Sequence, residues 1–259
     1  MNSLRRWPVC RSCIAEMSSR GSCWLVLCGV FLFAWLMPML TPWEENPQIL
    51  QPARAQASWV YLWLMMFSWL PFQAAVFGHR VCRDGLLDHL SAAGSKNFSL
   101  CLQITAAVVI WLLVLVLLGV LICGTVCLPK RHEEAVLWWQ LLAQYALLYS
   151  LSGIPLLWLA VALGTRVSEI IAFLMPVGLL FTGLFGAVWF VPLLEGSDHG
   201  LTRTFWMMLP HYHLADLTSR LVFKLGPLTA TDFITSIVTL SSQGTALVLF
   251  GLCLFRTRP

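Results

Sequence analysis

The residues that could perform acid–base or metal chemistry in this chain are few, and they lie in short stretches between long apolar runs. One group comprises Asp198, His199, His211, His213 and Asp216. Such side chains could bind a metal ion or transfer protons. Neighbouring histidines are common at a membrane surface, however, and the segment lacks an HExxH-type ligand frame. The sequence therefore favours a structural role for this group over a metal site.

Other patterns that could indicate chemistry are incomplete. Nine cysteines include Cys10 and Cys13 at a ligand-like spacing, but no second CxxC or histidine pair completes a four-ligand site. The pair Glu133-Glu134 has no downstream histidine frame, and neither a Gly-x-Ser-x-Gly nor a phosphate-binding Gly-x-x-x-x-Gly-Lys-Ser/Thr pattern occurs. We therefore expect no enzyme activity, no bound cofactor and no metal, and we expect that the chain does not hydrolyse ATP itself.

The composition identifies the medium in which the chain folds. Of its 259 residues 59% are hydrophobic and only 11% are charged, whereas soluble domains average about 25% charged residues. Such a chain cannot cover its surface with charge, so most of that surface must face lipid. Its apolar content excludes disorder. The modest net charge of +4, with no dense basic stripe, argues against a nucleic-acid partner.

The charges divide the chain into six long windows free of Asp, Glu, Lys, Arg and His. Each window exceeds the ~20 residues that a helix needs to cross a bilayer. We predict an all-α polytopic membrane protein of one domain, residues 1–259, whose six helices span approximately residues 22–40, 57–77, 99–124, 136–163, 169–192 and 233–255.

The orientation and the first span follow from the flanking residues. Ten Lys and Arg residues lie in the segments that are inside if both termini are cytoplasmic, against six in the others, which favours an N-in, C-in orientation. A cleaved signal peptide is the alternative for the first run, but the run is longer than the 7–15 apolar residues typical of signal peptides.

The windows contain only neutral polar residues. Proton-driven carriers and intramembrane hydrolases need ionisable groups within the bilayer, so this absence argues against both classes. The glutamines within the windows more often join helices than bind substrate. Gly178, Thr182 and Gly186 form a small-xxx-small face that could join helices within the chain or between two copies. Prolines such as Pro71 and Pro155 predict kinks.

The segment of residues 79–96 is predicted to contain a short amphipathic helix at the inner surface. Leu86, Leu87 and Leu90 would share one face, with charged residues such as Asp84 and Asp88 on the rest. The segment is either a solvated loop held by its leucines or a docking element for a cytoplasmic partner.

The outer segment of residues 192–232 is too long to be structureless. Pro210 ends a short apolar run, after which Leu214, Leu217, Leu221 and Leu225 would share one helical face. Asp216 and Arg220 would form an i, i+4 charge pair on another face. We expect two short helices over the outer mouth of the bundle.

This layout resembles the ABC-2 type permeases, the membrane subunits of ATP-binding-cassette transporters. Many of them carry Gly-Thr-Leu-Glu-x-Leu-Leu after the second span, followed by Pro-x-Ser-Arg. Here Gly85-Leu86-Leu87-Asp88-His89-Leu90 and Ser95-Lys96 are similar, although Leu86 replaces the threonine, the proline is missing, and Asp84 is the one acid before the glycine. Residues 210–227 are similar to the outer segment of permeases of multicopper-enzyme maturation systems.

The resemblance implies a division of labour. Two permease subunits, copies or paralogues, would form an export path in a bacterial cytoplasmic (inner) membrane. A separate ATPase subunit would bind ATP and dock on residues 83–90, of which Arg83, Asp84, Gly85, Leu86, Leu87, Asp88 and Leu90 are the expected contacts. One alternative is a membrane scaffold or assembly factor that contacts its partner through residues 198–232. Another, disfavoured, is a membrane enzyme that uses the outer histidines and Asp216.

Overall fold

The computed structural model describes residues 7–39, 47–92, 94–129, 131–196, 204 and 206–255. The protein is 86% helical, and the described residues contain no strand. The all-α prediction is therefore confirmed. In chain order the helices are α1 (Pro8–Ser19), α2 (Gly21–Met39), α3 (Pro47–Phe67), α4 (Trp69–Arg83), α5 (Leu86–Ala92), α6 (Asn97–Thr125), α7 (His132–Gly164), α8 (Glu169–Gly196), the 3₁₀ helix η2 (Tyr212–Ala215), α10 (Thr218–Val222) and α11 (Ala230–Leu254).

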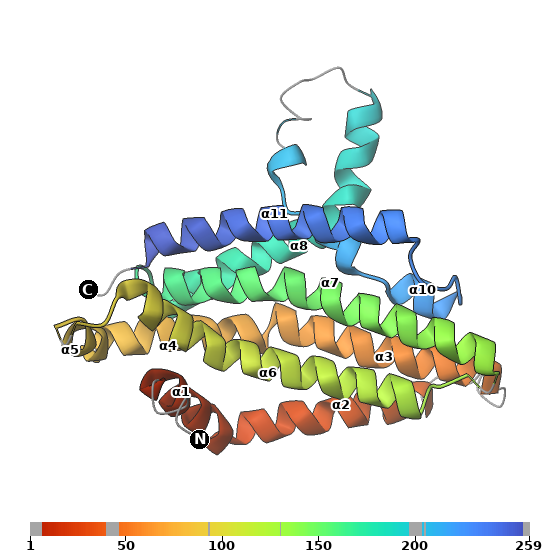
Figure 1. The fold of residues 1–259 in the computed structure, drawn as a ribbon, viewed down its shortest axis with the longest axis horizontal. Coiled ribbons are helices and arrows are strands. Elements are labelled where there is room, and N and C mark those ends of the chain that lie inside the picture. Colours follow the sequence, from red (N-terminus) through yellow and green to blue (C-terminus); the bar gives the residue numbers. More distant parts are fainter. Residues whose placement is uncertain are drawn as a thin grey trace.

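The long helices lie lengthwise in one bundle (Figure 1). Within the described residues five helical stretches are long and apolar enough to cross a membrane, with α3 and α4 counted as one. The number rises to six if α1 and α2, which meet at a bend of 69°, form a single broken span. The predicted ranges overlap α2, α3 with α4, α6, α7, α8 and α11. The helices have the length and composition of a polytopic membrane protein.

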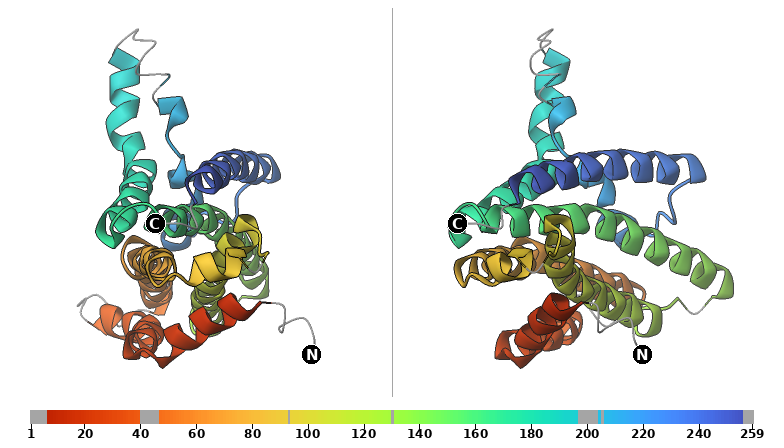
Figure 2. Two further views of the ribbon diagram at one scale, coloured as in Figure 1. Left: turned by 90° about the vertical axis from the view of Figure 1, so that its left-hand side faces the viewer. Right: turned by 60° about the vertical axis from the view of Figure 1, so that its left-hand side comes forward.

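Helix α7 forms the centre of the bundle. It packs against α4, α6, α8 and α11 (Figure 2), and 72% of its most apolar window is buried inside the protein. Two glycines bring its backbone against that of α4. A Cβ atom on Gly78 would lie 2.2 Å from the Val161 carbonyl oxygen, and one on Gly164 would lie 2.4 Å from the Ala75 carbonyl oxygen. Such close approach is how small residues join membrane helices.

The helix interruptions have identifiable causes. Between α3 and α4, Ser68 departs from helical geometry with φ −127° and ψ −79°. Pro71 follows three residues later and cannot donate a backbone hydrogen bond to the preceding turn, so the break predicted there is confirmed. By contrast, α7 continues through Pro155. Helix α8 bends, and its C-terminal part rises away from the bundle (Figure 1).

Two opposite ends of the bundle carry the short elements. Helices α1 and α5 and the last turns of α11 lie at one end, which we call the α5 end (Figure 1). Helix α10 and the connection between α6 and α7 lie at the other, which we call the α10 end. On the predicted orientation the α5 end would be cytoplasmic.

Candidate functional site

The turn into α5 depends on one glycine. Asp84 ends α4, and Gly85 adopts φ +68°, a backbone conformation that suits glycine. The chain then reverses into the seven residues of α5. A Cβ atom at Gly85 would meet no neighbour within 4 Å, so backbone conformation and not space explains the glycine.

The leucines of α5 do not share one face as predicted. Leu87 is fully buried and anchors the helix, and Leu90 packs partly against the core. Leu86 is 39% exposed instead. Successive residues of a helix point about 100° apart, and in α5 the core contact is made by the side of Leu87 and Leu90. The result is an exposed apolar side chain beside exposed Arg83 and Asp84.

Helix α5 contains one acidic residue, Asp88, and this residue is half-buried. Its Oδ1 atom is inaccessible to solvent and has no hydrogen-bond partner among the described residues. A carboxylate oxygen without a partner is costly to desolvate, so this atom is an unsatisfied acceptor beneath the surface of α5. Of the seven predicted docking residues, Leu87 is buried and the other six are exposed or half-buried around it. We call the surface that residues 83–90 form the α5 surface.

An ion cluster ties α1 to this end of the bundle. Glu16 forms an ion pair with Arg20, four residues further along the chain. It forms a second ion pair with Arg80 of α4, at 3.0 Å. Arg20 also donates to Gln73 Oε1 at 3.1 Å. Sequence reasoning missed this cluster because its members are up to 64 residues apart. The backbone of Val9 donates to Gln103 at 3.3 Å, which fixes the start of α1 on α6.

A polar hollow lies beside the α5 surface. It has a volume of about 620 Å³ and is lined by His79, Arg80, Arg83, Asp84 and Glu169. The α5 surface, the ion cluster and this hollow together give the α5 end a mixed-charge face with one exposed leucine.

The small-residue face of α8 is divided between two environments. A Cβ atom on Gly186 would lie 3.2 Å from the ring of Trp206, so Gly186 packs within the chain. Gly178 has open space around it. Thr182 Oγ1 donates to the Gly178 carbonyl oxygen at 3.0 Å and so satisfies its hydroxyl within the helix.

At the α10 end, two short helices follow Pro210 as predicted, but their charge pairing differs. Leu217 and Leu221 are buried, Leu214 is half-buried and Leu225 is 62% exposed. The predicted Asp216–Arg220 pair does not form. Helix α10 begins at Thr218, so Asp216 lies before it and the i, i+4 geometry does not apply. Arg220 donates instead to the carbonyl oxygens of Gly226 and Pro227.

Asp216, an exposed residue, bonds to the buried hydroxyl of Tyr145. The Tyr145 hydroxyl of α7 donates to Asp216 Oδ1 at 2.8 Å and accepts from the Trp63 indole at 2.9 Å. Thr218 lies 2.6 Å from the same hydroxyl and donates its backbone N–H to Asp216 Oδ1 at 3.0 Å. The Tyr145 ring stacks on Trp59 with centroids 3.8 Å apart. This Tyr145–Asp216 network joins α3, α7 and the outer segment.

Glutamines make the other joints. Gln144 donates to the Leu228 carbonyl oxygen at 3.2 Å and accepts from its N–H at 2.7 Å. Gln243 of α11 accepts from the N–H of His211 at 2.9 Å. With Gln73 and Gln103, these contacts confirm that the glutamines join elements.

The outer histidines have apolar and ring neighbours. His211 and His213 lie with ring centroids 5.6 Å apart, and Trp206 packs on both. In the described part of the chain, no three His, Cys, Asp or Glu side chains are placed to hold a metal ion. Asp198 and His199 lie outside the described residues.

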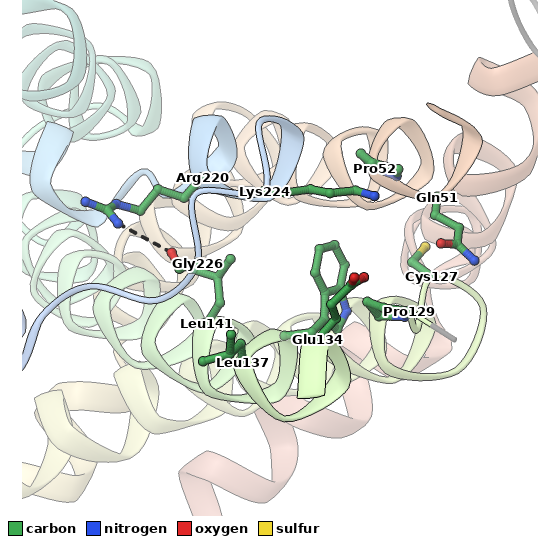
Figure 3. Close-up of a pocket in the computed structure, with 11 residues that line it drawn as sticks. Gln51, Pro52, Cys127, Pro129, Glu134, Leu137, Leu141, Arg220, Lys224 and Gly226 are labelled. Carbon is green, nitrogen blue, oxygen red and sulfur yellow. Dashed lines mark hydrogen bonds between the residues drawn. The ribbon is translucent and has the colours of Figure 1, made fainter. Parts of the chain in front are cut away.

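A cavity of about 280 Å³ opens at the α10 end, where α3, α7 and the outer segment meet (Figure 3). Lys224 extends along one side of it, and Glu134 rises from the first turn of α7 on the other. Leu137, Leu141 and Trp138 supply apolar walls. Sequence reasoning missed this cavity because its residues come from three distant segments.

No protein-family model matches the sequence, and no curated protein is similar to it in sequence. The functional argument therefore depends on the chain's own geometry.

Proposed function

We propose that this protein is the membrane subunit of an ATP-binding-cassette exporter, driven by a separate ATPase that docks on the α5 surface. The observation that carries the proposal is α5 itself. It is a short helix, anchored by buried Leu87, that presents exposed Leu86 beside exposed Arg83 and Asp84 at one end of an apolar helical bundle. Such an element suits a partner that supplies hydrogen-bond donors and an apolar contact.

A force applied to α5 would reach the bundle core through α4. Helix α5 follows α4 after two residues, so the two helices move together. Gly78 and Gly164 hold the backbones of α4 and α7 in direct contact. Because packed interfaces resist continuous deformation, α4 and α7 would shift as rigid bodies between discrete positions.

Helix α7 would carry the movement to the α10 end. Its Tyr145 bonds to Asp216 and its Gln144 to Leu228, so both α7 side chains hold the outer segment. A displacement of α7 must either carry this segment with it or break these bonds. This is the coupling that a transporter driven from one side needs in order to open on the other.

The proposal is tested by isolating the tagged full-length chain from its native membrane in mild detergent and measuring ATP hydrolysis and protein composition. We expect an ATPase subunit to co-purify with the wild type. The double charge reversal Asp84→Lys with Asp88→Lys should abolish its retention. Glu133→Lys makes the same kind of charge change at the α10 end and should leave it intact.

Two results would overturn the proposal. One is wild-type protein that purifies without any ATPase. The other is equal loss of the partner in the α5 variant and in the Glu133 variant, which would indicate a charge effect unrelated to the α5 surface. Gel filtration and thermal unfolding of each variant would show that the chain remains folded. A partner retained through residues 206–232 and not through α5 would favour a scaffold protein instead.

A further inference from the structure

The cavity at the α10 end combines opposite charges with apolar walls. The Lys224 ammonium has no hydrogen-bond or ion-pair partner among the described residues, and it lies on one side of the cavity (Figure 3). Glu134 lies on the other side, and its one ion pair within the described residues is with Arg131, at 3.5 Å, whose side chain is 85% exposed. An exposed pair of this kind is weak, so Glu134 is also available to a ligand.

The walls between these charges are apolar. Trp138 is buried, and its indole N–H is already bonded to the Cys123 carbonyl oxygen at 3.0 Å. It therefore offers the cavity an apolar ring and no free donor. Leu137 and Leu141 continue this wall along α7. The volume of about 280 Å³ equals roughly nine water molecules at ~30 Å³ each, enough for a small polar headgroup.

The backbone at Lys224 adds an independent observation. Its φ is +51°, and it is the one non-glycine residue with positive φ in the described part of the chain. Lysine is disfavoured in this conformation, where glycine or asparagine is usual. The positive φ belongs to the turn that ends α10, where the Leu225 N–H donates to the Arg220 carbonyl oxygen at 3.1 Å, and this turn directs the Lys224 side chain along the cavity (Figure 3).

The level of the cavity indicates where its occupant comes from. Trp138 and Trp139 lie within the first two turns of α7, where that helix begins, and Trp139 is 44% exposed. Tryptophans gather at the headgroup level of membranes. With the helices spanning a bilayer, the cavity would lie at the level of the phospholipid headgroups.

We infer that this cavity binds the headgroup of a phospholipid that carries a primary amine, of the phosphatidylethanolamine type. Its phosphate would lie at Lys224 and its ammonium would donate to Glu134 on the opposite side (Figure 3). The apolar wall of α7 would hold the first part of an acyl chain. This inference does not depend on the transporter proposal, because the cavity lies at the end opposite α5.

The headgroup chemistry makes the inference specific. A choline headgroup has the same phosphate but cannot donate a hydrogen bond to Glu134. A glycerol headgroup has the phosphate and no positive charge. Each of these two lipids would therefore lack one charge-assisted hydrogen bond that the ethanolamine lipid makes. This loss corresponds to about a tenfold preference for the ethanolamine lipid over the choline lipid and over the glycerol lipid.

The test is native mass spectrometry of the purified full-length protein, titrated with ethanolamine, choline and glycerol phospholipids of identical acyl chains. We expect the tenfold preference in the wild type. Glu134→Gln should remove the preference for ethanolamine over glycerol lipid, whereas Glu133→Gln, one position earlier and outside the cavity lining, should retain it. Lys224→Gly should weaken binding of all three lipids without loss of thermal stability, because glycine suits φ +51°.

Three outcomes would overturn the inference. They are equal retention of the three lipids, equal effects of the Glu133 and Glu134 variants, and unaltered binding by Lys224→Gly. Glycerophosphoethanolamine, which has the headgroup without acyl chains, distinguishes the source of the ligand. Weak competition by this compound supports a lipid, and competition as strong as that of the intact phospholipid would show that the cavity takes a soluble zwitterion.

Discussion

Replacing Tyr145 with phenylalanine isolates the contact between the bundle core and the outer segment. The change keeps the ring that stacks on Trp59 and removes only the hydroxyl. The buried Trp63 indole then loses its acceptor, which costs about 1–3 kcal/mol for an unsatisfied donor. Asp216 loses one charge-assisted bond but keeps the Thr218 N–H and water. We expect the free energy of unfolding to fall by about 2–4 kcal/mol.

The contribution of the Tyr145–Asp216 contact itself requires a double-mutant cycle. Unfolding of Tyr145→Phe, Asp216→Ala and the double variant would be measured by denaturant titration in mixed micelles. Because both residues belong to one network, we expect a coupling energy of about 1–2 kcal/mol.

Tyr149 provides the matched control for this cycle. It is equally buried on the same helix, and its hydroxyl donates to the Leu62 carbonyl oxygen at 2.6 Å without contacting Asp216. Tyr149→Phe should therefore be additive with Asp216→Ala to within about 0.5 kcal/mol. If the Tyr145 cycle were as additive as the Tyr149 cycle, the hydroxyl would not hold the outer segment, and the route proposed through α7 would be wrong.

Two further predictions concern the α4–α7 contact and the outer histidines. Gly78→Ala places a methyl group 2.2 Å from a backbone oxygen of α7 and should destabilise the protein by about 1–3 kcal/mol or more. Gly21→Ala is the control, because a methyl group there meets nothing within 4 Å, and it should leave the stability unchanged. Thermal unfolding of the two variants tests this difference. Burial, and then nearby His211, lower the pKa of His213 below its ordinary value. The unfolded chain therefore binds a proton more readily, so stability should be full above about pH 6.5 and fall as the pH drops below it. Unfolding curves at about pH 7.5 and 5.5 should show this fall, and His213→Gln should reduce it; an unchanged pH dependence would contradict the assignment.

The helices could be predicted from sequence because their signal is local. Continuous apolar runs and the charges between them locate α6, α7, α8 and α11 to within a few residues of their observed ends. The α5 helix was also predictable, since Gly85 and the leucines stand next to one another. Within it, only packing decides that Leu87 and not Leu86 is buried.

The contacts between segments could not be predicted in this way. The partners Glu16 and Arg80 are 64 residues apart, and Tyr145 and Asp216 are 71 apart. Neither pair has a spacing that indicates an interaction. The predicted Asp216–Arg220 pair was wrong although its spacing is the i, i+4 spacing of a helix. Helix α10 begins at Thr218, so Asp216 lies before the helix and the spacing does not apply.

The distribution of polar bonds constrains how the two ends could communicate. The central turns of α7 around Pro155 pack on apolar and small residues, and a Cβ atom on Gly244 of α11 would lie 2.8 Å from the Pro155 ring. The apolar windows contain no Asp, Glu, His, Lys or Arg that could relay a proton between the ends. Under the proposed function, a signal from α5 would therefore travel as displacement of whole helices. Helix α7, which contacts α4 through glycine backbones and the outer segment through Tyr145 and Gln144, is continuous between these contacts and can transmit such a displacement.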